Sequence, residues 1–211
     1  MKKKDATKSN PLDCDALEAQ KIKSKAKDLY LFFQNNEFVF QDSSSSKLLD
    51  FHYSESKTLK VYIALACQSE NNLSVLDISS VDEDDIPQLF KTAHENIERL
   101  DVNFVFLEGF ENKVLIAEQG LLNGEAILSA KQMIKAQTLL KAASIYVAIA
   151  RRGTILICAD HASDKEKRDF MDMHYRLWMY EESLNQRICD DVFIVKDGSI
   201  DEVVYLSLKA Q

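Results

Sequence analysis

The chain has 211 residues, of which 46% are hydrophobic, and it carries a formal net charge of −8. A chain of this size buries enough apolar surface to fold as one domain, and its negative charge argues against nucleic-acid binding. Its apolar runs stay well short of the roughly 18 residues that a membrane-spanning helix needs, so we expect no membrane segment.

The number and spacing of the cysteines indicate the redox state of the compartment in which the protein works. The four cysteines, at positions 14, 67, 158 and 189, are far apart in the sequence and form no C-x-x-C pair. Two of them lie inside apolar runs, where a thiol behaves as a small hydrophobic side chain. The N-terminal lysines are followed by polar residues instead of the apolar region of a signal peptide. We therefore expect a reducing, cytoplasmic compartment.

The N-terminal residues 1–12 are polar and rich in lysine, and we expect a mobile tail followed by a single domain over 13–211. Asp13 or Asp15 is a suitable helix N-cap, and the apolar residues that follow are spaced by three and four. These residues are Ala19, Ile22, Ala26, Leu29, Tyr30 and Phe33. The spacing predicts an amphipathic helix that extends to Phe33.

Three strands are predicted between this helix and residue 80. The four serines at 43–46 indicate a loop, and the apolar segments around it predict strands at about 47–54, 58–67 and 73–78. The serine tract is too short to separate independent domains, so 13–80 is at most an N-terminal subdomain.

A helix, a hairpin and another helix are expected next. Acidic residues at 82–85 precede apolar positions at helical spacing, and Pro87 is tolerated in the first turn, where amides need no partner. The apolar segments 103–107 and 114–117 flank a polar turn and predict a hairpin. A third helix is predicted at about 123–143. The positions expected on its apolar face are Ile127, Ala130, Ile134 and Thr138, widened by Met133 and Leu140.

The C-terminal part also reads as a helix followed by a hairpin. Ser163 and Glu166 have the capping-box spacing, so a fourth helix is expected to begin there and to run to about Leu184. Two apolar segments, 192–196 and 203–208, flank an Asp-Gly pair, which is the strongest short hairpin signal in the chain.

A helix followed by a hairpin thus recurs three times, over 84–118, 123–160 and 163–208. Consecutive antiparallel hairpins separated by helices predict an α+β fold in two layers, with a mainly antiparallel sheet and the helices on one face. A doubly wound parallel fold would instead alternate single strands and helices.

The stretch YVAIARRGTILICADH, residues 146–161, is the most sharply patterned part of the chain. It predicts two strands joined by a tight turn at Arg151, Arg152 and Gly153, and we expect both arginines to be exposed to solvent. The turn is either an ordinary charged turn or a tip that binds anions, because arginine matches planar anions bidentately. The strand 155–159 is apolar on both faces, so Ile157→Ala should cost about 2 to 5 kcal/mol and Arg151→Ala no more than roughly half a kcal/mol.

Further candidate residues follow this strand. Asp160 and His161 lie where a strand ends and a helix begins, a frequent place for functional groups, but Ser163 is already explained as a cap and we assign no catalytic residue. His174 lies on an apolar face typical of a core histidine, and Trp178 belongs to an aromatic helix suited to a core face, a partner groove or both. The histidines and cysteines show no metal-ligand spacing, so no metal is expected.

Motifs for nucleotide binding and hydrolysis are absent from the sequence. It contains no G-x-G-x-x-G, no G-x-x-x-x-G-K-[ST] and no G-x-S-x-G, and it has only five glycines. Phosphate-cradling loops and nucleophile elbows are therefore not expected, and no cofactor is predicted.

The order of elements over 84–208 resembles uncharacterised bacterial proteins of the YtpQ type. The resemblance rests on the helix with Ala93 to Ile97, the helix containing Ser129, the hairpin 144–160 and the closing helix and hairpin. It implies a bacterial protein with the fold of that family, whose activity is not established. A second, architectural likeness is to small acidic α+β secretion chaperones, which act by binding polypeptide.

The sequence favours a non-enzymatic cytoplasmic protein that binds another protein or assembles with itself, because the charge is acidic, catalytic motifs are missing and the fourth helix is aromatic. The candidate binding residues are Arg151, Arg152, Asp160, His161 and Trp178. The alternative is a small enzyme or ligand-binding protein whose site lies around the first four of these residues.

Overall fold

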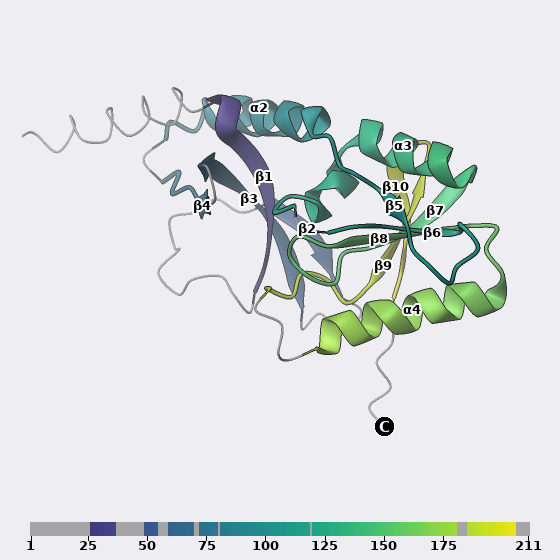
Figure 1. The fold of residues 1–211 in the computed structure, drawn as a ribbon. Coiled ribbons are helices and arrows are strands. Elements are labelled where there is room, and N and C mark those ends of the chain that lie inside the picture. The colour runs from purple at the N-terminus through teal and green to yellow at the C-terminus, as the bar shows by residue number, and fades with distance from the viewer. Residues whose placement is uncertain are drawn as a thin grey trace, which may run out of the picture.

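The structure, a computed structural model, describes residues 26–36, 49–54, 59–69, 72–79, 81–118, 120–180 and 185–205. The expected tail, the part of the predicted first helix before Ala26, and the serine tract lie outside the described residues. The described chain combines helices with two antiparallel sheets (Figure 1), which confirms the α+β class.

The first sheet comes from the N-terminal part of the chain. Its strands are β1 (Leu29–Asn35), β2 (Leu49–Tyr53), β3 (Lys60–Ser69) and β4 (Asn72–Val75). β3 pairs antiparallel with each of the other three, and the short 3-10 helix η1 (Ala26–Asp28) leads into β1. The predicted helix after the acidic residues is α2 (Ile86–Arg99), which packs on this sheet through Leu89, Ala93 and Ile97.

Residues 29–35 form a strand, so the prediction of a helix through Phe33 is wrong. Leu29, Leu31 and Phe33 are all buried and alternate along β1, which is the period-two pattern of a strand. The same stretch also fits a spacing of three and four when Tyr30 is included. Antiparallel pairing with β3 along the whole length of β1 decides between the two patterns.

The second sheet has the strand order β10-β9-β7-β8-β6-β5, and all its neighbouring strands are antiparallel. Its strands are β5 (Val105–Phe106), β6 (Val114–Ala117), β7 (Ser144–Ala148), β8 (Ile155–Ala159), β9 (Val192–Lys196) and β10 (Ser199–Val204). The three predicted hairpins are confirmed, although β10 begins directly after the turn and not at residue 203. The turn residues Asp197 and Gly198 both have positive φ, as this kind of two-residue hairpin turn requires.

Helices cover both faces of the second sheet. α3 (Ala130–Leu140) packs on the face that contains Ile157, whereas α4 (Asp164–Met179) packs through Phe170 on the face that contains Cys158. In Figure 1, α3 and α4 lie on opposite sides of the sheet. The expectation that the helices lie on one face is therefore wrong. The physical reason is β8, whose five residues are all buried and need cover on both sides.

The predicted third helix is divided in two. η2 (Gly124–Leu128) is a 3-10 helix, and α3 starts after Ser129, whose Oγ accepts a hydrogen bond from the first turn of α3. This break changes the angular position of the residues that follow. Ile134, expected on the buried face, is 50% exposed, while Met133 and Leu140 are buried.

The capping box predicted at the start of α4 is confirmed. The N–H of Glu166 donates to Ser163 Oγ, and the N–H of Ser163 donates to the Glu166 carboxylate at 2.7 Å. α4 ends at Met179, before the predicted end. Within the described part of the chain, no helix is long and apolar enough to cross a membrane.

Candidate functional site

The turn at Arg151, Arg152 and Gly153 has the predicted shape, but its arginines are buried. Gly153 has a φ of +79°, as expected of a glycine in a tight turn. Arg151 is 7% exposed and Arg152 is 9% exposed, so the expectation that both face solvent is wrong. The reason is that each guanidinium reaches acceptors in distant parts of the chain, which compensate for the loss of water.

Arg151 caps the C-terminal end of α4. Its guanidinium donates hydrogen bonds to four backbone carbonyls. They belong to Leu177, Trp178, Tyr180 and Asn185. The last carbonyls of a helix have no intrahelical donor, and a positive charge is favourable at that end of the helix dipole. Arg151 is therefore a structural cap.

Arg152 ties the two sheets together. It forms an ion pair with Glu125 of η2 and donates to the carbonyl of Phe33 in β1. Glu125 Oε1 also accepts from the N–H of Phe33 at 3.0 Å, and the Arg152 guanidinium lies 3.7 Å from the centre of the Phe32 ring. Burial raises the pKa of Glu125, and the charge of Arg152 acts in the opposite direction. The second arginine of the turn is thus structural as well.

The segment 185–191 runs beside the arginine turn. The N–H of Arg152 donates to the carbonyl of Gln186 at 2.8 Å. Asn35 Nδ2, at the end of β1, donates to the carbonyl of Arg187 at 2.8 Å. The segment therefore fastens the turn to the first sheet.

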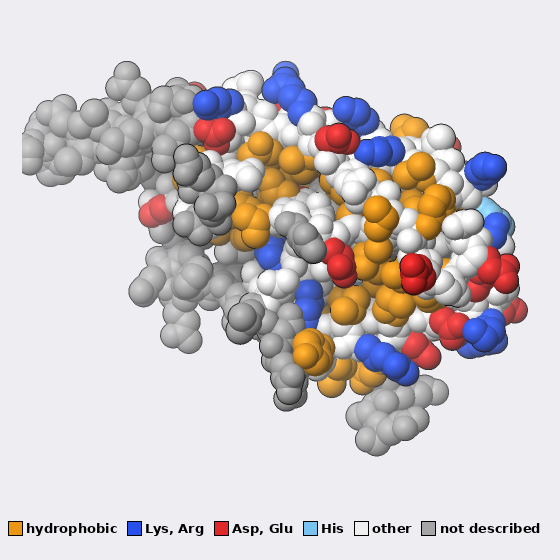
Figure 2. Space-filling view, viewed as in Figure 1, with side chains coloured by type: hydrophobic (Ala, Val, Ile, Leu, Met, Phe, Trp, Pro, Cys, Tyr) orange, Lys and Arg blue, Asp and Glu red, His pale blue; other side chains and the backbone are white. Residues whose placement is uncertain are grey.

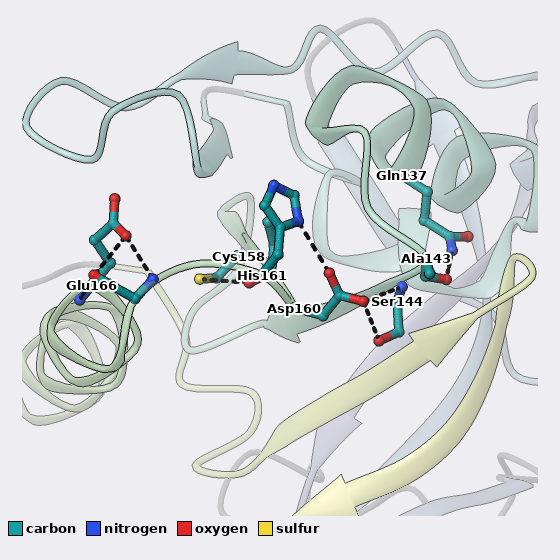
Figure 3. Close-up of polar contacts among 9 residues, drawn as sticks. Gln137, Ala143, Ser144, Cys158, Asp160, His161 and Glu166 are labelled. Carbon is teal, nitrogen blue, oxygen red and sulfur yellow. Dashed lines mark hydrogen bonds and ion pairs between the residues drawn. The ribbon is translucent and has the colours of Figure 1, made fainter.

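Asp160 and His161 lie at the other end of β8. Since that strand has five residues, its ends are on the order of 16 Å apart, so these two side chains do not join the arginine turn in one site. Figure 3 shows Asp160 between Ser144 and His161. Asp160 Oδ2 accepts from the Ser144 N–H at 2.9 Å and from its Oγ at 3.0 Å, and Oδ1 lies 3.1 Å from His161 Nδ1.

This cluster presents no activated nucleophile among the residues that the structure describes. A nucleophilic triad needs the hydroxyl to face the imidazole, but Ser144 donates to Asp160. Burial acts to raise the pKa of Asp160, but hydrogen bonds from Ser144 and His161 outweigh it and lower that pKa. Cys158, two residues earlier, is fully buried, and burial raises its pKa to about 12. The carboxylate thus mainly holds the end of β8 against the start of β7.

Trp178 and His174 are core residues. Trp178 is buried, and the Arg187 guanidinium lies 5.5 Å from the centre of its ring. His174 is fully buried with Nε2 at 2.9 Å from the carbonyl of Asp190, and burial lowers its pKa. Trp178 itself therefore lies on the core face of the aromatic helix, whereas Tyr175 and Met179 are exposed.

A cavity of about 460 Å³, partly open to solvent, lies over one face of β5 and β6. Six of its lining residues alternate along two extended segments. They are Asp101, Asn103 and Val105 on one segment and Ile116, Glu118 and Gly120 on the other. Val105 pairs with Ile116 in the ladder, and residues two apart in an extended chain face the same side. The cavity is therefore apolar toward the hairpin strands and polar with two carboxylates toward the other end.

Asn123 forms the remaining wall of the cavity, and it connects the cavity to the arginine turn. It is 9% exposed, and its Nδ2 donates to the carbonyl of Gly153 at 3.2 Å. Its Oδ1 accepts no hydrogen bond from the described residues. Position 120 requires glycine, because a Cβ there would overlap Asn123 Oδ1. By holding Glu125, two residues further on, Arg152 also positions this wall.

Neither a metal-binding group among the described residues nor a comparison with known proteins indicates a function for the chain. Among the described residues, no group of three or more His, Cys, Asp or Glu side chains could hold a metal ion. Comparison of the chain with protein-family models, curated proteins and solved structures finds no match. The resemblance to proteins of the YtpQ type and the likeness to secretion chaperones stay predictions.

The cavity residues were not predicted from the sequence, although a signal for them exists. The segments read D-x-N-x-V at 101–105 and I-x-E-x-G at 116–120, and each places polar and apolar residues on one strand face. The predicted hairpin of 103–107 and 114–117 would by itself place these two strand faces side by side. The wall formed by Asn123 depends on the arginine turn and has no local signal.

Proposed function

We propose that the chain is a non-enzymatic protein-interaction module whose binding surface is the outer edge of β5. One observation carries the proposal: Val105 and Phe106 are 48% and 42% exposed on a strand at the end of its sheet. No other described strand pairs with the outer side of β5. An open strand edge can receive a strand from another chain, with side-chain contacts adding specificity.

The surroundings of β5 support the proposal. Figure 2 shows hydrophobic side chains gathered where Figure 1 draws β5 and β6, with acidic side chains beside them. Leu121, next to the cavity residue Gly120, is 42% exposed. Contiguous exposed apolar surface with a polar rim is typical of protein-interaction sites. The partner is another protein or a second copy of this chain.

The contacts of the arginine turn support the interaction proposal over the alternative of an enzyme or ligand-binding protein with its site near these residues. Arg151 and Arg152 have their donors engaged with backbone carbonyls and Glu125, and Asp160 and His161 lie at the opposite end of β8. The interaction proposal needs none of these groups as ligands. We therefore keep the interaction function as the proposal.

We also propose that a helix followed by a hairpin is the repeating unit of the fold. The element order supports it: α2 precedes β5 and β6, α3 precedes β7 and β8, and α4 precedes β9 and β10. A bacterial source and a cytoplasmic location remain part of the proposal, and they rest on the resemblance and on the cysteine pattern.

The test is affinity capture by the full chain from native lysate, combined with sedimentation of the purified chain. The edge variant Val105→Thr/Phe106→Thr keeps residues that favour strands but reduces the apolar surface. The control Tyr175→Thr/Met179→Thr changes exposed apolar residues of α4 instead. We expect a stoichiometric partner or self-association that the edge variant loses and the control keeps. Equal results for wild type and both variants, or no association at near-cellular concentration, would overturn the proposal.

A further inference from the structure

We propose that the cavity over β5 and β6 receives a lysine or arginine side chain from an extended partner segment that lies alongside β5. This inference rests on the proposed function and names the chemistry of the partner. It follows from the shape of the cavity, its charges and the free backbone groups of β5, which are independent observations.

The cavity has room for a long basic side chain, and its lining has a matching polarity. Its apolar part, Val105 and Ile116, adjoins the strand edge where a partner backbone would lie, and its carboxylates lie toward the far end. Lysine and arginine have an apolar stem that packs on such surfaces while the charged group reaches a polar region. The cavity is therefore apolar near the strand edge and acidic further in, as a lysine or arginine side chain is apolar near its backbone and charged at its end.

The carboxylate that a cation would meet is Glu118. It is exposed and forms no hydrogen bond or ion pair with any residue that the structure describes. The second carboxylate, Asp101, already accepts from Lys135 Nζ at 2.9 Å, and this interaction lowers the pKa of Asp101. The turn between β5 and β6 carries Glu108, Glu111 and Lys113, so it adds one net negative charge to this hairpin. A cation is attracted, and an anion is repelled.

Asn123 supplies a further acceptor. Its side chain is nine-tenths buried in the cavity wall with Nδ2 fixed on the carbonyl of Gly153, which leaves Oδ1 without a donor among the described residues. Because Asn123 lines the cavity, a donor from water or a ligand can approach this oxygen. Ammonium and guanidinium groups are donors only, so they complement both Asn123 and Glu118.

The backbone of β5 accounts for the extended form of the partner. Leu107 N–H donates to the carbonyl of Val114, and Val105 pairs with Ile116, so these positions face β6. Alternation along an antiparallel ladder directs the N–H and C=O of Phe106 to the open side. Since this short edge offers so few backbone groups, strand addition alone is weak, and the side chain in the cavity has to provide most of the selectivity.

The experiment uses the full chain, labelled with ¹⁵N, and five-residue peptide probes followed by amide chemical shifts. The probes are acetyl-Thr-Val-Lys-Val-Thr-amide and its versions with arginine, norleucine or glutamate at the centre, and n-butylammonium serves as the free cation. We expect the lysine and arginine probes to bind about tenfold more tightly than norleucine, with glutamate weakest, and to shift amides at 101–105 and 116–120.

A charge-matched pair of variants locates the interaction. Glu118→Gln should weaken the lysine probe about fivefold, whereas Glu111→Gln, which removes the same charge outside the cavity, should change its affinity less than about twofold. Equal binding of the lysine and norleucine probes overturns the inference, as do equal effects of the two variants. Binding of n-butylammonium as tight as that of the lysine probe overturns the strand addition. If these results occur while the edge variant still loses its captured partner, only this inference fails and the proposed function stands.

Discussion

Arg152 and Glu125 form an ion pair inside the protein, with side chains that are 10% and 1% exposed. They are 27 residues apart in the sequence, and both also contact the backbone of Phe33 in β1. A pair of this kind is costly to break from one side, because the remaining charge stays buried without its partner.

We expect Arg152→Met and Glu125→Leu each to lower the free energy of unfolding by about 3 to 5 kcal/mol. The double variant should be less destabilised than either single variant, because it leaves no unpaired buried charge. Urea unfolding of the three variants measures these differences. Asp169→Asn, in the exposed pair with Lys165, is the control and should change stability by no more than about 0.5 kcal/mol. Additive effects in the double variant would contradict the structural pairing.

Arg151→Ala should lower the free energy of unfolding by about 3 kcal/mol, because several carbonyls at the end of α4 lose a charged donor. This reverses the small effect expected from an exposed turn. Arg151→Lys keeps the charge but lacks the planar fork, so it should recover only part of the loss. Urea unfolding gives the stabilities, and amide exchange should be faster at 176–180. A neutral Arg151→Ala substitution would show that the cap is unimportant.

The protein should lose stability below about pH 6.5 because of His174. Burial lowers the pKa of His174 in the folded protein, while the unfolded chain has the ordinary value of about 6.5. Above that pH neither state binds the proton, and below it the unfolded state takes up the proton first. The stability advantage over His174→Gln should therefore shrink by about 1 kcal/mol between pH 6.5 and pH 5.5. Urea unfolding at several pH values tests this, and a constant difference would contradict it.

The cysteines of the described chain should be unreactive in the folded protein. Cys67, Cys158 and Cys189 are all buried, and burial raises the pKa values of Cys158, to about 12, and of Cys189. The variant Cys14→Ser removes the remaining cysteine, which lies outside the described residues. This variant should react with a thiol reagent such as DTNB at pH 8 only after urea is added. A thiol that reacts rapidly without urea would place one of the three at the surface.

Patterns with local causes were predicted well from the sequence. The capping box at Ser163, the turn at Asp197 and Gly198, and the buried strand 155–159 depend on residues that are close together in the chain. Ile157→Ala keeps its expected cost of about 2 to 5 kcal/mol, because the side chain is fully buried.

Features with distant causes were not predicted. Leu29 to Phe33 fit both a helix and a strand, and only pairing with β3 selects the strand. The burial of Arg152 depends on Phe33, 119 residues away. The charge of Arg152 and its place in a turn predicted that it is exposed to solvent, and this prediction was wrong because it took no account of that distant contact. The division of the third helix at Ser129 had a local signal, since serine favours the N-cap position, but the apolar spacing around it masked that signal.

The contacts of β1 also set the order in which the protein can be completed during synthesis. Phe33 and Asn35 leave the ribosome before their partners Arg152 and Arg187, which follow 119 and 152 residues later. Until then the nascent chain cannot form these two links of β1. Folds that depend on such distant pairings close slowly, over milliseconds to seconds. The last folding steps are therefore expected only after Arg187 has been translated, with chaperones able to bind the uncovered strands in the meantime.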